Sequence, residues 1–507
     1  MATQKTARRS RTAWALTLAL LSAGVSVAPV GVARSESGRP AEGTSADALV
    51  GEPTLVAAIA PLLSAPVLRG ARIGLVVSRA EGGAPLLALA PDRPLHPASN
   101  TKLLTTAAVL VRLGPDFTID TDLVVDRLTA GAAGTLWLVG RGDPGFVLED
   151  LWRIVDEARG RGLKVVEGDV VLDDSYFTPE RMPPGFDARN TDESFRAPSG
   201  ALSLNFNALR VRVSPGPTVD APLEVSLDPD TPYARIENEG VTRKRGRPRL
   251  KVEVTPDGER VVVHVGGTLA LDDPGFETRR RIVDPTGFMG EALRALLAQR
   301  GIEVRGAIRR GQAPSASTPT VLLARQTSRP LSWLAAQVNK YSNNFMAEQL
   351  LRTLGAVRRG RGGFEEGRLE LLDFLERDVG TGSLKIANGS GLFGDTTVSA
   401  AQLVHVLQWV RARRPALPEF DASLAIGGTD GTLRRRMRSV PPYSVRAKTG
   451  TLNGVVALSG YTTFADGSGA AFSILFNDVP DRPWDLWQVQ DGIVTAIQAH
   501  TPTPLPR

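Results

Sequence analysis

The chain has 507 residues, of which 42% are hydrophobic and 22% charged, with a formal net charge of +6. This composition is ordinary for a soluble globular protein and leaves room for two to four domains. Cysteine is absent, which excludes disulfides, thiolate catalysis, cysteine-ligated metals and a lipoprotein anchor. Because the four histidines are scattered without ligand spacing, the sequence favours neither a zinc site nor a Ser-His-Asp triad.

The N-terminus has the pattern of an export signal. The apolar run from 13 to 32 follows four basic residues: Lys5, Arg8, Arg9 and Arg11. Small residues before Ala33 offer a cleavage site, and cleavage there lowers the formal charge from +6 to +2 because those four charges leave. We therefore expect an exported protein, periplasmic or attached to the cell envelope, and no nucleic-acid partner. The alternative is a retained membrane anchor, for which Pro29 and the many small residues make a weak span.

The pattern of predicted elements changes near residue 118. Before it, a short helix over 55–63 and a strand hairpin over 72–90 follow a polar lead. From 118 to 315, short strands bounded by Gly, Pro and Asp, with a helix near 149–158, predict one or two small β-rich modules inserted into a parent domain. The basic loop at 243–249 is interpreted as a solvated turn.

Helical periodicity over 331–354 is broken at Tyr341–Asn344, and three strands and a final helix close the chain. Early and late strands together predict one sheet built from both ends of the sequence. The expected parts are a signal peptide (1–33), a flexible lead (34–50), a parent domain (51–117 and 316–500), an insert (118–315) and a tail (501–507).

The strongest chemical signal is a buried helix that opens with a serine. Residues 99–113 are expected to form it, stopped by Gly114-Pro115, with apolar residues on almost every side. Ser99 and Lys102 share a helix face at i and i+3, so their side chains can meet. A buried lysine loses charge stabilisation and can accept a proton from the hydroxyl. The alternative is an N-cap serine beside a lysine that extends to solvent.

Two further patterns add chemistry to this pair. Ser342-Asn343-Asn344 lies in the polar break between two helices, where a hydroxyl can relay a proton and an amide can hold a substrate carbonyl. Lys448-Thr449-Gly450-Thr451 begins a late strand, where the lysine and threonine can bind a carboxylate and the glycine allows a close backbone approach. Each pattern alone also fits an ordinary loop or bulge.

Ser-x-x-Lys, Ser-Asp-Asn and Lys-Thr-Gly form the signature of penicillin-binding proteins and class A β-lactamases. All three occur here in order, with Asn343 in place of the middle aspartate, and Ser99 and Ser342 are 243 positions apart. The chain resembles the D-alanyl-D-alanine carboxypeptidase C family, the penicillin-binding protein 4 type, over roughly residues 50–500. The matching stretches are His96–Lys102, Gly142–Pro144, Ala201–Asn207, Lys340–Asn344, Gly389–Leu392, Gly431–Leu433 and Ala447–Leu452.

The resemblance implies an α+β fold: a serine transpeptidase/β-lactamase-like domain, an antiparallel sheet flanked by helices, with two nested β-rich inserted domains. It implies hydrolysis of the terminal D-Ala-D-Ala bond of peptidoglycan stem peptides, D,D-endopeptidase action on crosslinks, and inhibition by β-lactam antibiotics, without a metal or organic cofactor. Loose association with the membrane or cell wall is also expected.

The resemblance also implies roles for individual residues. Ser99 is the expected nucleophile and Lys102 its base, Ser342 a proton relay and Asn344 a substrate-orienting amide. Lys448, Thr449, Gly450 and Thr451 are the expected substrate-binding residues, and the backbone N–H groups of Ser99 and Thr451 the oxyanion hole.

One departure is Asn388, where the family usually has aspartate before Gly-Ser-Gly-Leu; we expect an altered hydrogen bond near the site. Two alternatives stay open at this point. A serine β-lactamase shares the acylation step, although the long insert and the missing deacylating glutamate motif argue against it. A non-catalytic wall-binding protein would explain the insert but does not need three intact motifs.

Overall fold

The computed structural model describes residues 48–186, 191–315, 317–413 and 418–504. The predicted signal peptide and nearly all of the predicted flexible lead lie outside the described residues. Val50, the last residue of that lead, instead belongs to β1 (Val50–Gly51), which pairs with a strand of the main sheet. Within the described ranges, no helix is long and apolar enough to cross a membrane.

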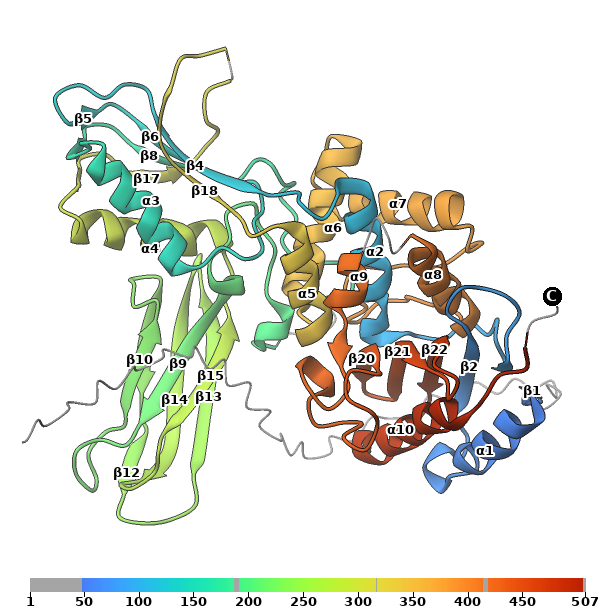
Figure 1. The fold of residues 1–507 in the computed structure, drawn as a ribbon. Helices are drawn as coiled ribbons and strands as arrows, with labels where there is room; N and C mark the ends of the chain where they lie inside the picture. Colours follow the sequence, from blue (N-terminus) through green and yellow to red (C-terminus); the bar gives the residue numbers. More distant parts are fainter. Residues whose placement is uncertain (1–47, 187–190, 316, 414–417, 505–507) are drawn as a thin grey trace, which may run out of the picture. The chain divides into compact units, whose positions relative to one another are not determined.

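A seven-stranded sheet is the framework of the domain that carries the three motifs (Figure 1). Its order is β1-β3-β2-β22-β21-β20-β19, and every neighbouring pair is antiparallel. The two ends of the chain meet where β2 pairs with β22, which confirms the predicted sheet. The remaining strands are β2 (Arg72–Arg79), β3 (Leu87–Leu89), β19 (Ala425–Ile426), β20 (Arg446–Leu452), β21 (Val455–Thr463) and β22 (Gly469–Asn477).

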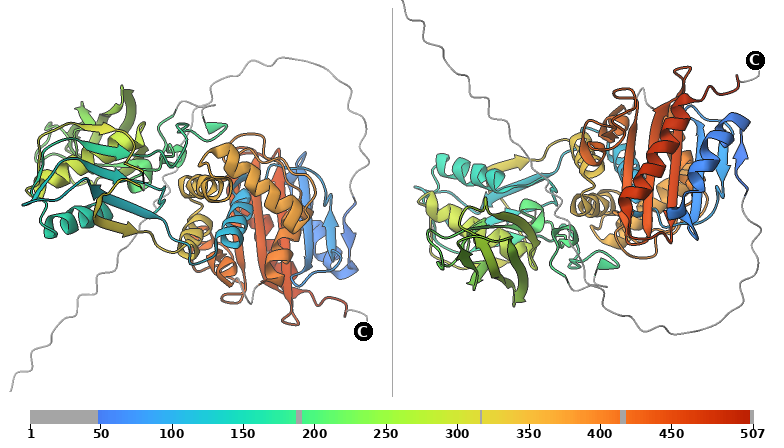
Figure 2. Two further views of the ribbon diagram at one scale, coloured as in Figure 1. Left: turned by 90° about the horizontal axis from the view of Figure 1, so that it is seen from above. Right: turned by 90° about the horizontal axis from the view of Figure 1, so that it is seen from below.

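Helices cover both faces of this sheet, which explains why β2, β21 and β22 are almost continuously apolar and buried. Figure 2 (right) shows α10 lying along one face with α1 beside it. Most of the other helices lie on the opposite side of the sheet, where α8 contacts β2, β21 and β22. The helices of this domain are α1 (Pro53–Leu63), α2 (Thr101–Leu113), α5 (Leu331–Tyr341), α6 (Asn344–Arg359), α7 (Phe364–Asp373), α8 (Ala400–Ala412), α9 (Pro418–Ser423) and α10 (Pro483–Ala499).

The predicted helix over 99–113 begins two residues later than expected. Ala98–Asn100 form a 3₁₀ turn, and α2 starts at Thr101. Ala98 has a φ of 46°, so the chain bends sharply just before Ser99. The helix itself is central, as predicted, because every residue from Thr101 to Leu110 is buried.

The insert contains two modules, one nested within the other. The outer one has the sheet β17-β8-β6-β4-β18, a small sheet β16-β7-β5, and helices α3 (Leu148–Gly160) and α4 (Pro285–Gln299). Its strands are β4 (Asp120–Val125), β5 (Ala132–Ala133), β6 (Leu136–Val139), β7 (Val165–Val166), β8 (Val170–Asp173), β16 (Glu303–Val304), β17 (Ile308–Arg310) and β18 (Val321–Thr327). The inner one has β9 (Ala208–Ser214), β10 (Glu224–Asp228), β11 (Ala234–Asn238), β12 (Val241–Arg243), β13 (Arg249–Asp257), β14 (Arg260–Ala270) and β15 (Phe276–Arg281).

These elements confirm the predicted α+β class with an antiparallel sheet, flanking helices and nested inserts. The insert ends later than the expected residue 315, because β18 pairs with β4 in the sheet of the outer module. Cross-strand pairing, which the local pattern does not reveal, places its last strand at Val321–Thr327. The insert has its own apolar core, which includes Leu138, Val155 and Phe288.

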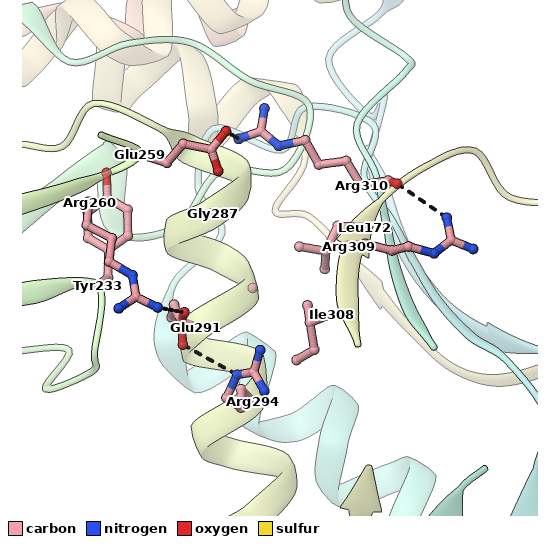
Figure 3. Close-up of a pocket in the computed structure, with 11 residues that line it drawn as sticks. Leu172, Tyr233, Glu259, Arg260, Gly287, Glu291, Arg294, Ile308, Arg309 and Arg310 are labelled. Atoms are coloured by element: carbon pink, nitrogen blue, oxygen red, sulfur yellow. Dashed lines mark hydrogen bonds and ion pairs between the residues drawn. The ribbon is translucent and has the colours of Figure 1, made fainter. Parts of the chain in front are cut away.

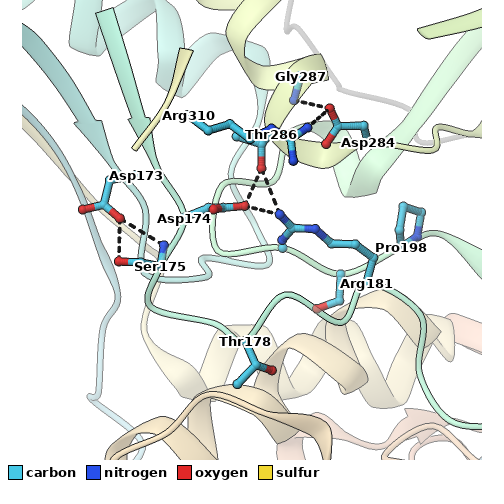
Figure 4. Close-up of polar contacts among 12 residues, drawn as sticks. Asp173, Asp174, Ser175, Thr178, Arg181, Pro198, Asp284, Thr286, Gly287 and Arg310 are labelled. Atoms are coloured by element: carbon cyan, nitrogen blue, oxygen red, sulfur yellow. Dashed lines mark hydrogen bonds and ion pairs between the residues drawn. The ribbon is translucent and has the colours of Figure 1, made fainter. Parts of the chain in front are cut away.

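Residues 174–186 and 191–207 of the insert contact both the outer module and α6 of the parent domain. At the start of the first range, Asp174 accepts hydrogen bonds from Arg181 and from Thr286 at the beginning of α4 (Figure 4). Farther along, Gln349 Nε2 of α6 donates to Gly200 O at 2.9 Å. We call residues 174–186 and 191–207 the connecting segment.

Arg352 of α6 is the main anchor of the connecting segment. Its buried guanidinium donates to Thr178 O at 2.6 Å, Glu180 O at 2.8 Å and Gly362 O at 3.0 Å. The Phe177 and Phe364 rings lie 4.4 and 4.6 Å from the guanidinium carbon. Burial disfavours the charged guanidinium and lowers the pKa of Arg352 to about 9. The carbonyl oxygens and the two rings oppose this effect because they interact favourably with the positive charge.

We expect Arg352→Met to destabilise the protein by roughly 3–5 kcal/mol, because the change leaves several buried carbonyls without donors. Urea unfolding measures the loss. Arg361→Met is the matched control, since Arg361 is 65% exposed and pairs with Glu366 at the surface, and it is expected to cost less than about 1 kcal/mol. Equal losses in the two variants would contradict the assigned role.

Candidate active site

The first two predicted residues meet at the start of α2. Lys102 Nζ lies 2.9 Å from Ser99 Oγ, and it also donates to Asn344 Oδ1 at 2.6 Å and to Ser390 O at 2.7 Å. Three separate segments of the chain therefore supply acceptors to one lysine. Lys102 has no solvent exposure, so the alternative of a lysine that extends to solvent is wrong.

The environment of Lys102 makes it a base at neutral pH. Burial disfavours the ammonium and lowers the pKa of Lys102 to about 7, although the charge of Glu348 opposes this shift. A lysine with this pKa is largely neutral just above pH 7 and can take the proton of the Ser99 hydroxyl. The pair is therefore suited to nucleophilic catalysis.

The second motif lies between α5 and α6. Ser342 ends α5 with a φ of 57°, and Asn343 caps α6 by accepting from Met346 N at 3.0 Å. This left-handed turn presents the Ser342 hydroxyl to Lys448 Nζ at 2.9 Å. Asn344, one residue further, bonds Lys102 through Oδ1 and donates from Nδ2 to Phe195 O of the connecting segment at 3.1 Å.

The third motif lies on β20, at the other side of Ser99. Lys448 is fully buried, and burial together with the charge of Lys102 holds the pKa of Lys448 well below its usual value. Thr449 Oγ1 donates to Thr432 Oγ1 at 2.8 Å, and Thr451 is exposed. Lys448 thus lies behind Ser342, whereas Thr449 and Thr451 are nearer to solvent.

Gly450 allows β20 to approach the turn before Ser99. A Cβ at Gly450 would lie 2.9 Å from Pro97 O and 3.0 Å from the Ala98 Cβ, closer than a side chain tolerates. β20 and the turn Ala98–Asn100 are in contact, so the N–H groups of Ser99 and Thr451, the predicted oxyanion hole, belong to neighbouring elements.

The sequence patterns did not identify Glu348 and Ser390 as parts of this site. Ser390 contributes its carbonyl to Lys102, and Glu348 accepts from Ser390 N at 2.8 Å. A signal for Glu348 was present, since it is an acidic residue within the apolar run Phe345–Leu351, one helical turn after Asn344. A contribution from a backbone carbonyl, such as that of Ser390, leaves no trace in residue types.

Asn388, the departure noted in the sequence, acts here as a donor. Its Nδ2 donates to Pro184 O and Leu392 O, both at 3.0 Å, while its Oδ1 accepts from Gly391 N at 2.9 Å. A carboxylate cannot make the first two bonds. The amide thus joins the loop beside Lys102 to the connecting segment.

A pocket of about 380 Å³ lies elsewhere, in the insert, between α4 and β17 (Figure 3). Arg260 and Arg294 on its wall pair with Glu291, and Arg310 pairs with Glu259. None of the predicted site residues lines it. The described residues contain no group of three side chains suited to hold a metal ion.

Comparison with known proteins agrees with this geometry. Residues 55–498 match the D-Ala-D-Ala carboxypeptidase 3 (S13) family. The D-alanyl-D-alanine carboxypeptidase of Actinomadura sp. (strain R39) is 32% identical over 450 residues, 86% of this chain and 83% of that protein. The D-alanyl-D-alanine carboxypeptidase DacB of Haemophilus influenzae is 26% identical over 388 residues, 75% and 80% of the two chains.

A solved structure, penicillin binding protein 4 (dacB) from Haemophilus influenzae, has a TM-score of 0.77 at 23% identity and covers 87% of this chain and 99% of its own. Its likeness shows the fold. The relatives define the class, a peptidase of the D-Ala-D-Ala carboxypeptidase kind. The chain belongs to the D-Ala-D-Ala carboxypeptidase 3 (S13) family, and its fold is similar to that of penicillin binding protein 4.

We expect Asn388→Asp to destabilise the protein by about 2 kcal/mol or more at pH 8, because the new carboxylate would face carbonyl oxygens without a donor. Burial raises the pKa of such a carboxyl above its unfolded value of about 3.9. The charge penalty is therefore absent below that value and grows as pH rises above it.

Thermal unfolding at pH 4 and pH 8 checks this expectation. Asn453→Asp in the exposed turn after β20 is the control, and its stability is expected to stay within about 0.5 kcal/mol of wild type. An Asn388→Asp protein that is as stable as the wild type at pH 8 would show that the amide donor is dispensable.

Proposed function

We propose that this protein is a serine D-Ala-D-Ala carboxypeptidase that hydrolyses peptidoglycan stem peptides through an acyl-enzyme on Ser99. The observation that supports it best is the 2.9 Å contact between Ser99 Oγ and the fully buried Lys102 Nζ. A serine beside a neutral lysine is an activated nucleophile. Family membership adds the substrate class.

Acylation moves one proton from Ser99 to Lys102 and another from Ser342 to the leaving amine. Ser99 Oγ attacks the penultimate D-Ala carbonyl carbon while Lys102 takes its proton, and the N–H groups of Ser99 and Thr451 bind the oxyanion. When the C–N bond breaks, Ser342 passes its proton to the leaving amine of the terminal D-Ala and takes a replacement from protonated Lys448, whose Nζ donates to Ser342 Oγ. In deacylation the attacking water gives up a proton that restores Lys448, and Lys102 returns its proton to Ser99 Oγ as the ester bond breaks.

The terminal carboxylate binds at β20 in this proposal. Thr449 and Thr451 supply hydroxyls near the solvent side, and Lys448 supplies positive charge from behind Ser342. An arriving carboxylate favours the protonated form of Lys448, whose pKa is lowered in the free protein by burial and by Lys102. Asn344 releases Lys102 and orients the substrate amide.

The same chemistry extends to D,D-endopeptidase action on crosslinks, in which the leaving amine belongs to a second stem peptide. The exposure of Thr451 and of Tyr341, 44% exposed beside Ser342, leaves room for a leaving group larger than D-Ala. β-Lactam antibiotics acylate Ser99 as substrate mimics. We further propose that the protein is exported and acts in the cell envelope, loosely associated with the membrane or wall.

We expect Ser99→Ala to abolish the covalent penicillin adduct, because no other group takes the acyl chain. Lys102→Ala keeps the hydroxyl but loses the base, so acylation should slow about 10²–10⁴-fold. The double variant should be no worse than Ser99→Ala, since the two residues act as one unit. Intact-protein mass spectrometry after penicillin exposure measures the adduct.

A full-stoichiometry adduct on Ser99→Ala, mapped to another residue, would overturn the assignment of the nucleophile. The same experiment separates the alternative function: a wild-type adduct that persists indicates a penicillin-binding carboxypeptidase, and one that turns over rapidly indicates a β-lactamase.

Lys448→Ala is expected to weaken carboxylate-bearing substrates most, about 10–100-fold in kcat/KM, because a charge-assisted contact contributes about 1.5–3 kcal/mol. Peptides ending in D-Ala-D-Ala are compared with an ester substrate that lacks the terminal carboxylate. Thr463→Val, at the exposed end of β21, is the control. An equal loss on both substrates would instead indicate that Lys448 acts only through Ser342 and does not bind the carboxylate.

A further inference from the structure

Glu348 is a buried carboxylate next to the catalytic lysine that the mechanism above does not use. It lies on α6, one turn after Asn344, and is 1% exposed. Its two oxygens accept from two consecutive backbone N–H groups, Gly389 N at 3.1 Å and Ser390 N at 2.8 Å. Two N–H bonds favour the ionised form, against the effect of burial, which raises the pKa of Glu348.

The loop that Glu348 holds is also tied to α2. Ser390 O accepts from Lys102 Nζ at 2.7 Å, and Gly389 O accepts from Thr105 Oγ1 at 2.7 Å. The N–H groups of Gly389 and Ser390 thus face α6, and their carbonyls face α2. One carboxylate fixes the position of a carbonyl that contacts the amine of the base.

Glu348 also acts on Lys102 through its charge. Among the described residues, the charge that acts on Lys102 is that of Glu348 from α6, whereas Lys448 from β20 has its own charged form disfavoured by burial and by Lys102. Glu348 stabilises the protonated amine. Without Glu348, burial would act unopposed, and the amine would be a weaker base.

We propose that Glu348 is a positioning residue for Lys102, which orients the amine through the Gly389–Ser390 backbone and keeps it basic enough to deprotonate Ser99. The inference rests on the proposed acylation of Ser99. It adds a residue from outside the three motifs, one that touches neither the substrate nor the nucleophile. Loss of its negative charge should therefore alter the pH dependence of acylation, whereas a merely structural anchor would alter only its maximum.

The experiment measures the rate of acylation by penicillin from pH 5 to 9 in the full chain. In the wild type, the rate should rise with pH through about 7, as Lys102 loses its proton. Glu348→Gln removes the charge that stabilises protonated Lys102, so the rise should move to lower pH by half a unit or more. The maximum should fall about tenfold or more, because the amine is less basic and less well placed.

Glu348→Asp is the second variant, since it keeps the charge but shortens the side chain. Its maximum should fall while its pH midpoint stays within about 0.3 of wild type. If Glu348→Gln does not fold, a Glu348→Asp midpoint displaced to lower pH would still overturn the inference. Glu370→Gln is the matched control: Glu370 is a buried glutamate of α7, paired with Arg112 and Arg359. Its midpoint should equal that of the wild type.

A Glu348→Gln midpoint that coincides with wild type, or moves to higher pH, would overturn the inference, as would a Glu348→Asp midpoint displaced to lower pH by half a unit. These results differ from a failure of the proposed function. If the wild type itself forms no adduct on Ser99, the acylation mechanism fails; if it does, the midpoints test Glu348 alone.

Discussion

The complete burial of Lys102 is the constraint on which the site depends. A lysine in water is protonated near neutral pH and cannot accept the proton of a serine. Here the ammonium is shielded by α2, α6 and the loop at 388–392, and its pKa falls to about 7. Burial of a nitrogen donor is tolerable only because Ser99, Asn344 and Ser390 all provide acceptors. The base is therefore a product of packing between distant parts of the chain.

Close backbone approach on two sides places Ser99 at that base. Gly450 of β20 lies against Pro97, and Gly391 of the loop lies against Ala98, where a Cβ would come within 2.0 Å of Ala98 O. Gly391 also has a φ of 71°, which favours glycine. The turn that carries the nucleophile is thus held between a strand and a loop from the second half of the sequence.

The insert takes part in this arrangement instead of being attached beside it. Phe195 O accepts from Asn344, Pro184 O from Asn388, and Thr178 O from Arg352. The connecting segment therefore supports both α6 and the loop next to Lys102. Because these contacts use backbone carbonyls of the insert, they depend on its path more than on its side chains.

The sequence by itself determined the elements and the motif residues. Periodicity predicted α2, α5, α10 and the late strands, because each buries one face or both against neighbours, and motif order predicted the family, which the comparisons confirm. The structure brings Ser99, Lys102 and Asn344 into one cluster and Ser342 with Lys448 into another contact, while their roles stay predictions. Only the tertiary structure decided that β18 belongs to the insert, that Asn388 is a donor, and that Glu348 reaches Lys102 through Ser390. Strand pairing such as that of β18 is independent of side-chain type, and the Asn388 and Glu348 side chains bond backbone groups, among them Pro184 O and Ser390 N, that come close only in the folded chain.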